Sequence, residues 1–537
     1  MSNALASSGR VSAAVFASRI LGLVREVVFA ALFGAGAVAD AFQVAFRIPN
    51  LVRDLFAEGA LSTAFVPTFT AAMAEEGKEG AFRLANLTAS AQLLATGVLT
   101  VVGLLLAEDI TIWISDGFAG DATKVALATS LTKILMPFLA VVALAAVWMG
   151  MLNAQRRFVM PALAPALFNV ASIAAGGVVW LLGTDANDGV MVWAVGTLVA
   201  GAVQAGVQLP ALWRMGYRPW LRFRGMTTHP GVRRIARLMA PAILGVAAIQ
   251  ISVFVNTRFA GSLGDGAVSQ LSYAFRLFFL PLGVFGVALA TVATTSVSEE
   301  AAKGDRAAIA ARAAESVSAA WMLTSASAVG LLVLAVPVCT LVYRHGQTTA
   351  SDVVAIAWAL QAYVLGLVSY SIVKILAPAY YSVDRPRIPI AASVTGVVVN
   401  VTFNALTYER LGAPGIALGT ALGATANVAI LWLSLERVIA APPSAQRGKK
   451  LGALALANGL LGVVVWGGWW MAERGLDAWL GTELVGMRVW LSALPLLAVI
   501  AVGFWVYVGV LQRSGYPGAD QLARLPAAIG RRLRPRR

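Results

Sequence analysis

The chain has 537 residues, of which 59% are hydrophobic and only 12% charged, and its 41 basic against 26 acidic residues give a formal net charge of +15. Soluble domains carry about 25% charged residues, so this composition excludes an ordinary soluble protein and indicates a membrane protein with many helices. One cysteine, Cys339, and two separated histidines, His229 and His345, exclude an internal disulfide and a metal site built from cysteine or histidine.

Apolar runs of about 20 residues, long enough to cross a bilayer as a helix, recur along the whole chain. We therefore predict an all-α polytopic membrane protein with about 14 transmembrane helices. The first two are the least apolar, because they carry most of the charges that fall inside spans. The predicted spans are 11–34, 40–72, 84–106, 126–152, 161–183, 190–213, 238–259, 268–297, 315–343, 353–381, 389–407, 414–437, 451–472 and 488–511.

Basic residues gather on alternate connections between the predicted spans. Connections that face the cytoplasm when the N-terminus is inside hold clusters such as 214–237, 303–312 and 447–450, whereas the opposite connections collect aspartates. Since positive residues favour the cytoplasmic side, we expect both termini in the cytoplasm. Basic clusters of this kind indicate membrane topology and not nucleic-acid binding.

A weak internal repeat divides the chain. Ala45-Phe46-Arg47-Ile48 matches Ala274-Phe275-Arg276-Leu277, and 157–161 resembles 385–389 at almost the same offset. That offset covers six predicted helices, which predicts two lobes related by an axis along the membrane normal. We expect an N-terminal lobe at 1–225, a C-terminal lobe at 226–440, two additional helices at 441–515 and a basic cytoplasmic tail at 516–537.

Charged residues in the first two spans break the apolar pattern. On a helix, Arg19, Gly22, Arg25 and Glu26 fall within one arc of about 120°. The second span repeats the arrangement, with Pro49 expected to bend the helix. Its polar residues are Asp40, Arg47, Asn50, Arg53, Asp54 and Glu58.

A charge at mid-membrane costs about 2.5–3.5 kcal/mol, so such a cluster must face protein or water. We expect both stripes, with Arg276 from the matching helix of the second lobe, to line one hydrated cationic cavity. For a single arginine the alternatives are snorkelling to an interface or a structural ion pair, such as Arg25–Glu26 or Arg47–Asp54. Lys133 and Lys374, each isolated on an apolar helix, fit such a structural role at least as well as a functional one.

Arginine binds phosphate through a planar fork of donors and stays charged at any accessible pH. Several buried arginines therefore indicate an anionic ligand, most simply a phosphate or diphosphate. The chain has no Gly-x-x-x-x-Gly-Lys-Ser/Thr loop and no nucleophile–base pair placed for catalysis, so we expect a carrier and not an enzyme.

Several motifs resemble the MurJ (MviN) family of lipid II flippases. The opening run Ser18-Arg19-Ile20-Leu21-Gly22-Leu23-Val24-Arg25-Glu26 resembles the family's Ser-Arg-x-Leu-Gly-x-x-Arg-Asp, and 33–36, 40–42, 45–51 and 56–60 follow its pattern. Further on, 152–158 with 161–163, and Ser272-Tyr273-Ala274-Phe275-Arg276-Leu277, fit the same family.

The resemblance implies the fold of the multidrug/oligosaccharidyl-lipid/polysaccharide exporter superfamily. It also implies movement of lipid II, an undecaprenyl-pyrophosphate-linked disaccharide peptide, to the outer leaflet of the bacterial plasma membrane. Family positions for substrate binding correspond to Arg19, Arg25, Arg53 and Arg276, and Asp40 and Glu58 correspond to positions used in gating. The two additional helices, roughly 451–511, would form a groove for the polyprenyl tail.

The sequence departs from the family at three places. Glu26 stands where the family has Asp, and Phe275 and Phe279 replace polar neighbours of Arg276 that some relatives carry. Asn256 stands where some relatives hold sodium with an aspartate, so we expect no metal and no cofactor.

These patterns together predict alternating access, with Gly22 and Pro49 allowing the first two helices to bend and the membrane potential driving the cycle. The partners expected are lipid II, membrane lipids, and cell-wall synthesis or division proteins. The alternatives are a flippase for another polyprenyl-linked polysaccharide, a multidrug antiporter of the same superfamily, a membrane-bound polyprenyl-phosphate transferase and a scaffold for division proteins. The transferase would need metal-binding carboxylates, and the scaffold leaves the arginines unexplained.

Overall fold

The computed structural model describes residues 2–57, 60–303, 305–439, 447–480 and 489–524, and every regular element in them is a helix. The prediction of an all-α fold is confirmed. The described chain forms two compact units: unit 1 comprises residues up to Ser269 together with Gly346–Thr348, and unit 2 comprises Gln270–His345 and the chain from Thr349 onward. The predicted lobe boundaries at 225 and 440 stay predictions.

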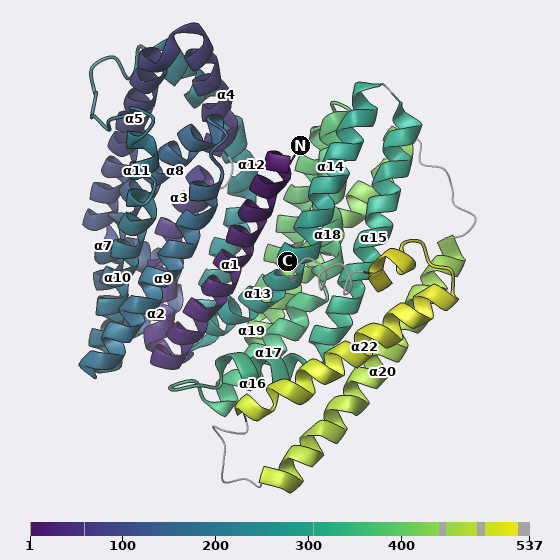
Figure 1. The fold of residues 1–537 in the computed structure, drawn as a ribbon. Helices are drawn as coiled ribbons and strands as arrows, with labels where there is room; N and C mark the ends of the chain where they lie inside the picture. The colour runs from purple at the N-terminus through teal and green to yellow at the C-terminus, as the bar shows by residue number, and fades with distance from the viewer. Residues whose placement is uncertain (1, 58–59, 304, 440–446, 481–488, 525–537) are drawn as a thin grey trace. The chain divides into compact units, whose positions relative to one another are not determined.

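Unit 1 holds the first twelve α-helices and a short 3-10 helix, shown from purple to teal in Figure 1. They are α1 (Ser2–Phe33), α2 (Ala37–Ala45), α3 (Arg47–Ala57), α4 (Ala60–Glu75), α5 (Gly77–Leu105), α6 (Ala107–Ile114), η1 (Asp116–Gly120), α7 (Ala122–Leu135), α8 (Phe138–Ala154), α9 (Val159–Leu182), α10 (Ala186–Gly206), α11 (Leu209–Trp213) and α12 (Pro230–Gly261). The next helix, α13 (Ala267–Pro281), begins in unit 1 and continues into unit 2.

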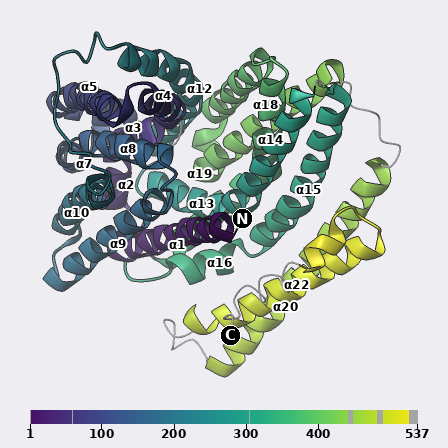
Figure 2. The same cartoon turned by 45° about the horizontal axis from the view of Figure 1, so that its top comes forward.

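Unit 2 continues with a π-helical turn and eight further helices. They are η2 (Leu282–Gly286), α14 (Val287–Ala302), α15 (Arg306–Val333), α16 (Ala335–Tyr343), α17 (Ala350–Val364), α18 (Leu367–Ser382), α19 (Arg387–Ile439), α20 (Arg447–Leu480) and α22 (Ala493–Arg513). The last two run side by side in both views (Figures 1 and 2) and pack on each other, and α20 also packs on α15.

Nine helical stretches in the described chain are long and apolar enough to cross a membrane, or ten if the pair α17–α18, bent by 42°, counts as one. This number is below the 14 predicted. Three predicted spans, 11–34, 40–72 and 238–259, are helical but are not among these stretches. The predicted spans 389–407 and 414–437 lie on either side of Gly412 in α19, which is counted above as one stretch. The φ of 60° and ψ of −151° at Gly412 are not helical, so α19 joins two helices at a kink and these two spans agree with the structure.

The predicted second span is interrupted where the sequence places a proline. Helix α2 ends at Ala45 and α3 begins at Arg47, and the backbone N–H groups of Phe46 and Asn50 still bond four residues back. Pro49 has no N–H to give to the carbonyl of Ala45, and its ring crowds that carbonyl. The break therefore follows from Pro49, as expected.

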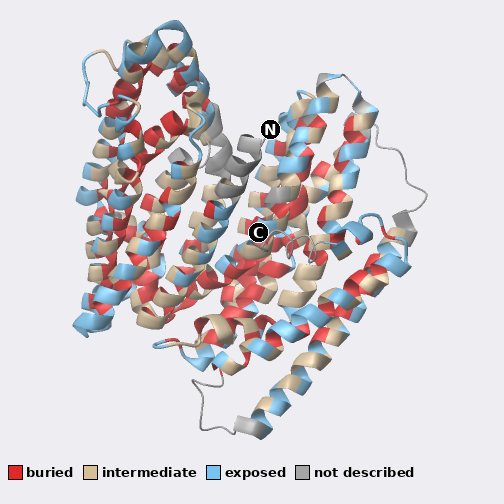
Figure 3. Cartoon of the chain, in the orientation of Figure 1, coloured by how far each residue is buried: buried red, intermediate tan, exposed pale blue. Residues whose placement is uncertain are grey.

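Buried residues in each unit lie on the inward faces of the helices (Figure 3). In unit 1, α1 packs along α9, and a cluster around Phe65, Phe69 and Trp148 joins α4, α5 and α8. In unit 2, the buried Tyr507 of α22 donates from its hydroxyl to the carbonyl of Met322 on α15, at 2.6 Å. Side chains classed as exposed on these helices are those not covered by protein, which in a membrane means contact with lipid or water.

Candidate functional site

The predicted polar stripe of the first span lies on α1 beside α9. The side-chain amide of Asn169 on α9 donates to the carbonyl of Ser18, at 3.0 Å, and a Cβ added at Gly22 would lie 3.4 Å from the same nitrogen. Arg19 is half-buried and forms no ion pair with a described carboxylate. The stripe therefore borders the α1–α9 contact.

Arg25 and Glu26 form an ion pair between sequence neighbours on α1. The Nη2 of Arg25 lies 2.6 Å from the Oε1 of Glu26, and the two side chains are 15% and 8% exposed. The guanidinium also lies 5.5 Å from the centre of the Phe168 ring of α9, within the range of a cation–π contact. Protein thus covers most of the arginine, and a carboxylate partly neutralises it.

A second pair of sequence neighbours lies on α3. The Nη2 of Arg53 lies 3.2 Å from the Oδ1 of Asp54, with the side chains 27% and 22% exposed. Asp54 also accepts from the side-chain amides of Asn50, at 3.4 Å, and Gln250 on α12, at 3.5 Å. The ion pair that Asp54 makes is therefore with Arg53 and not with Arg47, the sequence-based alternative. Arg47 itself is half-buried at the start of α3.

Asp40 on α2 has a different environment, because its partners come from distant parts of unit 1. Its side chain is fully covered and accepts from the backbone N–H of Gly266, at 2.7 Å, and of Ser269, at 2.8 Å. The Nζ of Lys124, on α7, lies 3.5 Å from Asp40 and 2.7 Å from the carboxylate of Asp265. The same amine lies 4.0 Å from the centre of the Phe118 ring.

This set, hereafter the Lys124 cluster (Asp40, Phe118, Lys124, Asp265 and the Gly266–Ser269 turn), was only partly predicted. Sequence analysis selected Asp40 but did not select Lys124 or Asp265. One signal could have indicated a special role for Lys124: it lies in the first turn of α7, where the helix dipole disfavours a cation. A lysine placed there needs a specific anionic partner.

The two remaining predicted site residues cannot be grouped with these. Arg276 lies on α13 in unit 2 and is exposed. Glu58 lies outside the described residues. The single cavity expected to gather all four arginines therefore stays a prediction.

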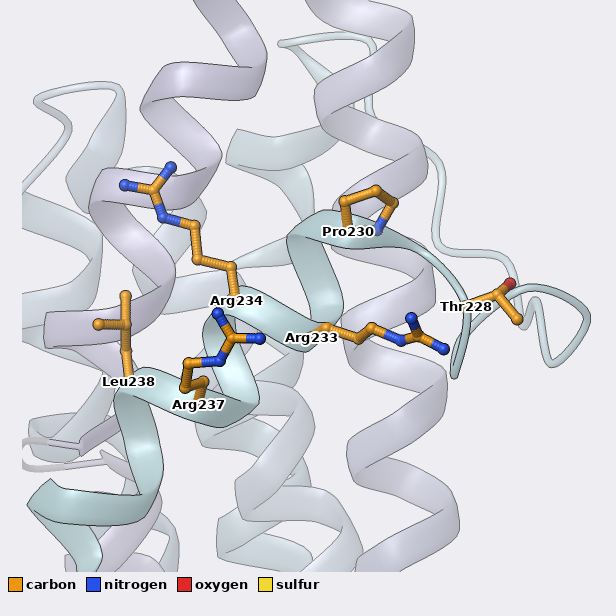
Figure 4. A pocket seen from close by; sticks show the side chains of 6 residues that line it. All are labelled: Thr228, Pro230, Arg233, Arg234, Arg237 and Leu238. Atoms are coloured by element: carbon orange, nitrogen blue, oxygen red, sulfur yellow. The ribbon is translucent and has the colours of Figure 1, made fainter.

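Two cavities of unit 1 are lined by other residues. One, of about 500 Å³, lies at the start of α12 (Figure 4), and the other, of about 420 Å³, lies against α5. Among the described residues no three His, Cys, Asp or Glu side chains come together to hold a metal ion.

Comparison with known proteins places this architecture in a family. The model of the family described as "Lipid II flippase MurJ" matches residues 29–489, which is most of the chain. The chain belongs to the MurJ family. A relative from Burkholderia cenocepacia, named lipid II flippase MurJ, is 34% identical over 429 residues, which cover 80% of this chain and 83% of that protein. The predicted family is confirmed.

Solved structures show the same fold. One described as lipid II flippase MurJ in an inward closed conformation superposes with a TM-score of 0.76 at 23% identity, covering 93% of this chain and 99% of the other. An inward-facing multidrug resistance MATE transporter of the MOP superfamily superposes with a TM-score of 0.66 at 17% identity, covering 79% of this chain and 95% of the other. At these identities the two structures show the fold alone, and that fold is the one expected from the family resemblance.

Proposed function

We propose that this MurJ-family chain moves lipid II from the inner to the outer leaflet of the bacterial plasma membrane. The observation that carries the proposal is the family match over residues 29–489, together with a relative that is 34% identical and is named as a lipid II flippase. Lipid II carries its disaccharide peptide on a polyprenyl diphosphate, so the chemical problem is to pass a large anionic headgroup through an apolar layer.

The arginines on α1 and α3 suit this task because they are neutralised locally. Arg25 and Arg53 each pair with the carboxylate of the following residue, so neither pair needs a distant element to form. A diphosphate offers stronger, bidentate acceptors to a guanidinium than one carboxylate does. The incoming headgroup can therefore replace Glu26 and Asp54 as the partner of these arginines without separating helices that the pairs hold together.

Arg19 and Arg276 complete the proposed substrate site. Arg19 lies two turns before Arg25 on α1, and Arg276 is the member contributed by α13. Gly22, Glu26, Asp40, Arg47, Asn50 and Glu58 are the proposed gating and cavity-lining residues. In the proposed cycle the headgroup binds to these arginines, while the polyprenyl tail stays in lipid beside 451–511.

The two final helices fit contact with a lipid tail. Exposed apolar residues lie along both, including Val463 and Trp466 on α20 and Leu497 and Trp505 on α22. A polyprenyl chain could pack along such a surface without leaving the hydrocarbon layer.

The membrane potential can supply the energy of the proposed cycle. Each negative charge that moves outward across an inside-negative membrane gains about 2.3 kcal/mol per 100 mV. A diphosphate headgroup carries at least two such charges, so the cycle needs neither ATP nor a catalytic site. We accordingly propose a carrier without cofactor or enzymatic activity, multi-pass in the plasma membrane with both termini inside. Proteins of cell-wall synthesis or division are its further proposed partners.

The test is rescue of a bacterial strain in which the resident lipid II flippase is depleted. The wild-type chain should restore lipid II at the outer leaflet, and Arg25→Ala, Arg53→Ala and Arg276→Ala should each reduce export by about tenfold to a hundredfold, the loss expected from removing one charge-assisted contact. Arg258→Ala is the matched control, because Arg258 forms an exposed ion pair with Asp116, at 2.8 Å.

Membrane levels of each variant, measured by immunoblot, separate loss of export from loss of protein. Failure of the wild-type chain to rescue would overturn the proposed activity. Full rescue by all three arginine variants would overturn the proposed site.

A further inference from the structure

The connection between α11 and α12, residues 214–229, alternates arginines with large apolar side chains. Arg218, Arg222 and Arg224 flank Trp220 and Phe223, and the Trp220 side chain is 71% exposed. Tryptophan and other aromatic residues collect at the membrane–water interface, and arginine is attracted to anionic headgroups there. The composition of this connection is therefore that of a segment lying on a membrane surface.

Hydrogen bonds fix the backbone of this connection along one turn of α5. The side-chain oxygen of Asn86 accepts from the hydroxyl of Tyr217, at 2.6 Å, and from the backbone N–H of Trp220, at 3.2 Å. One turn later, Ser90 accepts from the backbone N–H of Arg222, at 2.7 Å. Burial raises the pKa of Tyr217 to about 12, so its hydroxyl keeps the proton that it donates. The exposed side chains thus project from a backbone that is held in place.

Beyond this connection lies the cationic cavity of Figure 4, formed by the first turns of α12. It has a volume of about 500 Å³ and is lined by Thr228, Pro230, Arg233, Arg234, Arg237 and Leu238. Arg233 extends toward the Thr228 turn, and its Nε donates to the carbonyl of Thr227, at 2.7 Å. Arg234 extends to the opposite side (Figure 4).

None of the three arginines forms an ion pair with a carboxylate of the described chain, and no acidic residue lines the cavity. They also follow the N-terminus of α12, where the helix dipole favours an anion. The volume lies within the range of about 300–1,000 Å³ that small-molecule sites occupy. Three unneutralised guanidinium groups around such a cavity match a phosphate group.

The same connection also contributes to an apolar surface. Phe223 closes a cavity of about 420 Å³ whose other lining residues are apolar and come from α5: Leu93, Leu94, Gly97, Val98, Val101 and Val102. Leu238 gives the arginine cavity itself an exposed apolar wall. A ligand that is anionic at one end and apolar at the other fits this arrangement better than a free anion does.

We infer that the α12 cavity binds the phosphate of an anionic phospholipid, with Arg233, Arg234 and Arg237 as its cationic lining and acyl chains packing on the apolar surfaces of Leu238 and Phe223. This is a second lipid site, separate from the arginines on α1 and α3, and its occupant is a resident of the membrane and not the transported lipid. Binding there ties the start of α12 and the 214–229 connection to the membrane surface.

The test measures lipid binding to the purified full chain by native mass spectrometry. The lipids are phosphatidylglycerol, zwitterionic phosphatidylcholine and a polyprenyl diphosphate, and glycerol 3-phosphate serves as the free headgroup. The variant Arg233→Gln/Arg234→Gln/Arg237→Gln removes the three cations that line the cavity. The variant Arg312→Gln/Arg385→Gln/Arg387→Gln removes three exposed arginines elsewhere and is the matched control for net charge.

We expect the wild-type chain to prefer phosphatidylglycerol to phosphatidylcholine, and the site variant to lose about a hundredfold in affinity for phosphatidylglycerol, from three arginines near a membrane surface. The control variant should stay within about threefold of wild type. Circular dichroism and the melting temperature in phosphatidylcholine should match among all three proteins, which separates lost binding from lost folding.

Four results would overturn the inference. Equal losses in both variants would mean a general effect of charge, and unchanged binding by the site variant would mean that the lipid binds elsewhere. If glycerol 3-phosphate bound as tightly as phosphatidylglycerol, or if the polyprenyl diphosphate depended on these arginines more than phosphatidylglycerol did, the site would belong to a free anion or to the transported lipid. None of these outcomes bears on whether the chain exports lipid II.

Discussion

Two regions of unit 1 use buried charge in opposite ways. In the Lys124 cluster, the amine of Lys124 and the carboxylate of Asp40 are 84 residues apart, and Asp40 accepts from backbone groups 226 and 229 residues away. On α1 and α3, by contrast, Arg25–Glu26 and Arg53–Asp54 join residues next to each other in sequence. The ion pairs of the first arrangement join separate elements, whereas each ion pair of the second lies within one helix.

The difference indicates what each set of charges can do. An ion pair between neighbours on one helix does not itself join two helices, so an anionic ligand can replace its carboxylate without breaking an ion pair across the fold. A pair across the fold cannot be opened without exposing or stranding a buried charge, which is costly. In this unit we therefore assign a structural role to buried long-range pairs such as Lys124–Asp40, and we propose that the arginines of the short-range pairs on α1 and α3 serve a ligand.

The largest effect should come from breaking the Lys124 cluster. Lys124→Met removes the amine beside Asp40 and keeps the apolar stem over Phe118. It should lower the free energy of unfolding by about 3–5 kcal/mol, because Asp40 keeps a fully buried charge. Thermal unfolding of the purified protein measures this loss, and Lys133→Met on the exposed side of the same helix is the control.

A double mutant distinguishes charge from packing in that result. Lys124→Met/Asp40→Asn should lose less stability than the sum of the single variants, since it leaves no unpaired charge. Additive losses would contradict the assignment of Lys124 as the partner of Asp40.

Exchanging the two members of the α1 pair should change stability less than breaking the Lys124 cluster does, and it should act mainly on export. Arg25→Glu/Glu26→Arg keeps both charges adjacent but turns the guanidinium by about 100° around the helix. We expect melting within a few degrees of wild type and export of lipid II reduced by about tenfold or more, because the donor no longer faces the headgroup.

The exchange Arg312→Glu/Glu315→Arg provides the control, because that pair is exposed on α15 with its atoms 3.2 Å apart. If the exchange on α1 restored full export, Arg25–Glu26 would be an ion pair of purely structural value. Short-range pairing on α1 would then not indicate an arginine that serves a ligand.

The smallest effect should come from disturbing the close packing of α1 on α9. A Cβ at Gly176 on α9 would lie 2.6 Å from Val28 and 2.9 Å from Trp193, whereas one at Gly177 would meet nothing within 4 Å. Gly176→Ala should therefore destabilise the protein by about 1–3 kcal/mol, and Gly177→Ala should leave it unchanged or slightly more stable. Thermal unfolding of the two variants side by side measures the difference, and equal melting temperatures would show that close packing of α1 on α9 is unimportant.

The sequence predicted the class of fold better than the number of spans. Apolar runs correctly indicated an all-helical membrane protein, and they separated the two helices of α19 that meet at Gly412. Hydropathy alone does not decide whether a helix that carries several charges crosses the membrane. Helix α1, with Arg19, Arg25 and Glu26, is such a helix and is not among the apolar stretches of the described chain.

Prediction of the candidate site was likewise limited by distance along the chain. Residues within one helical stripe, such as Arg25 with Glu26, could be grouped from helical geometry alone. The contacts of Lys124 with Asp40 and Asp265 could not, because they depend on how α2, α7 and the turn before α13 meet in space. The sequence pattern gives Lys124 no partner, and it explains the three arginines of α12, which fall in the basic cluster 214–237, as topology signals alone.

The break before Pro49 has a mechanical consequence. It separates α2, which the Lys124 cluster holds through Asp40, from α3, which carries Arg53 and contacts α12 through Asp54 and Gln250. Without the Ala45 to Pro49 hydrogen bond, the two segments meet at a joint in place of a rigid rod. Helix α3 can then pivot, carrying its guanidinium with it, while α2 remains clamped.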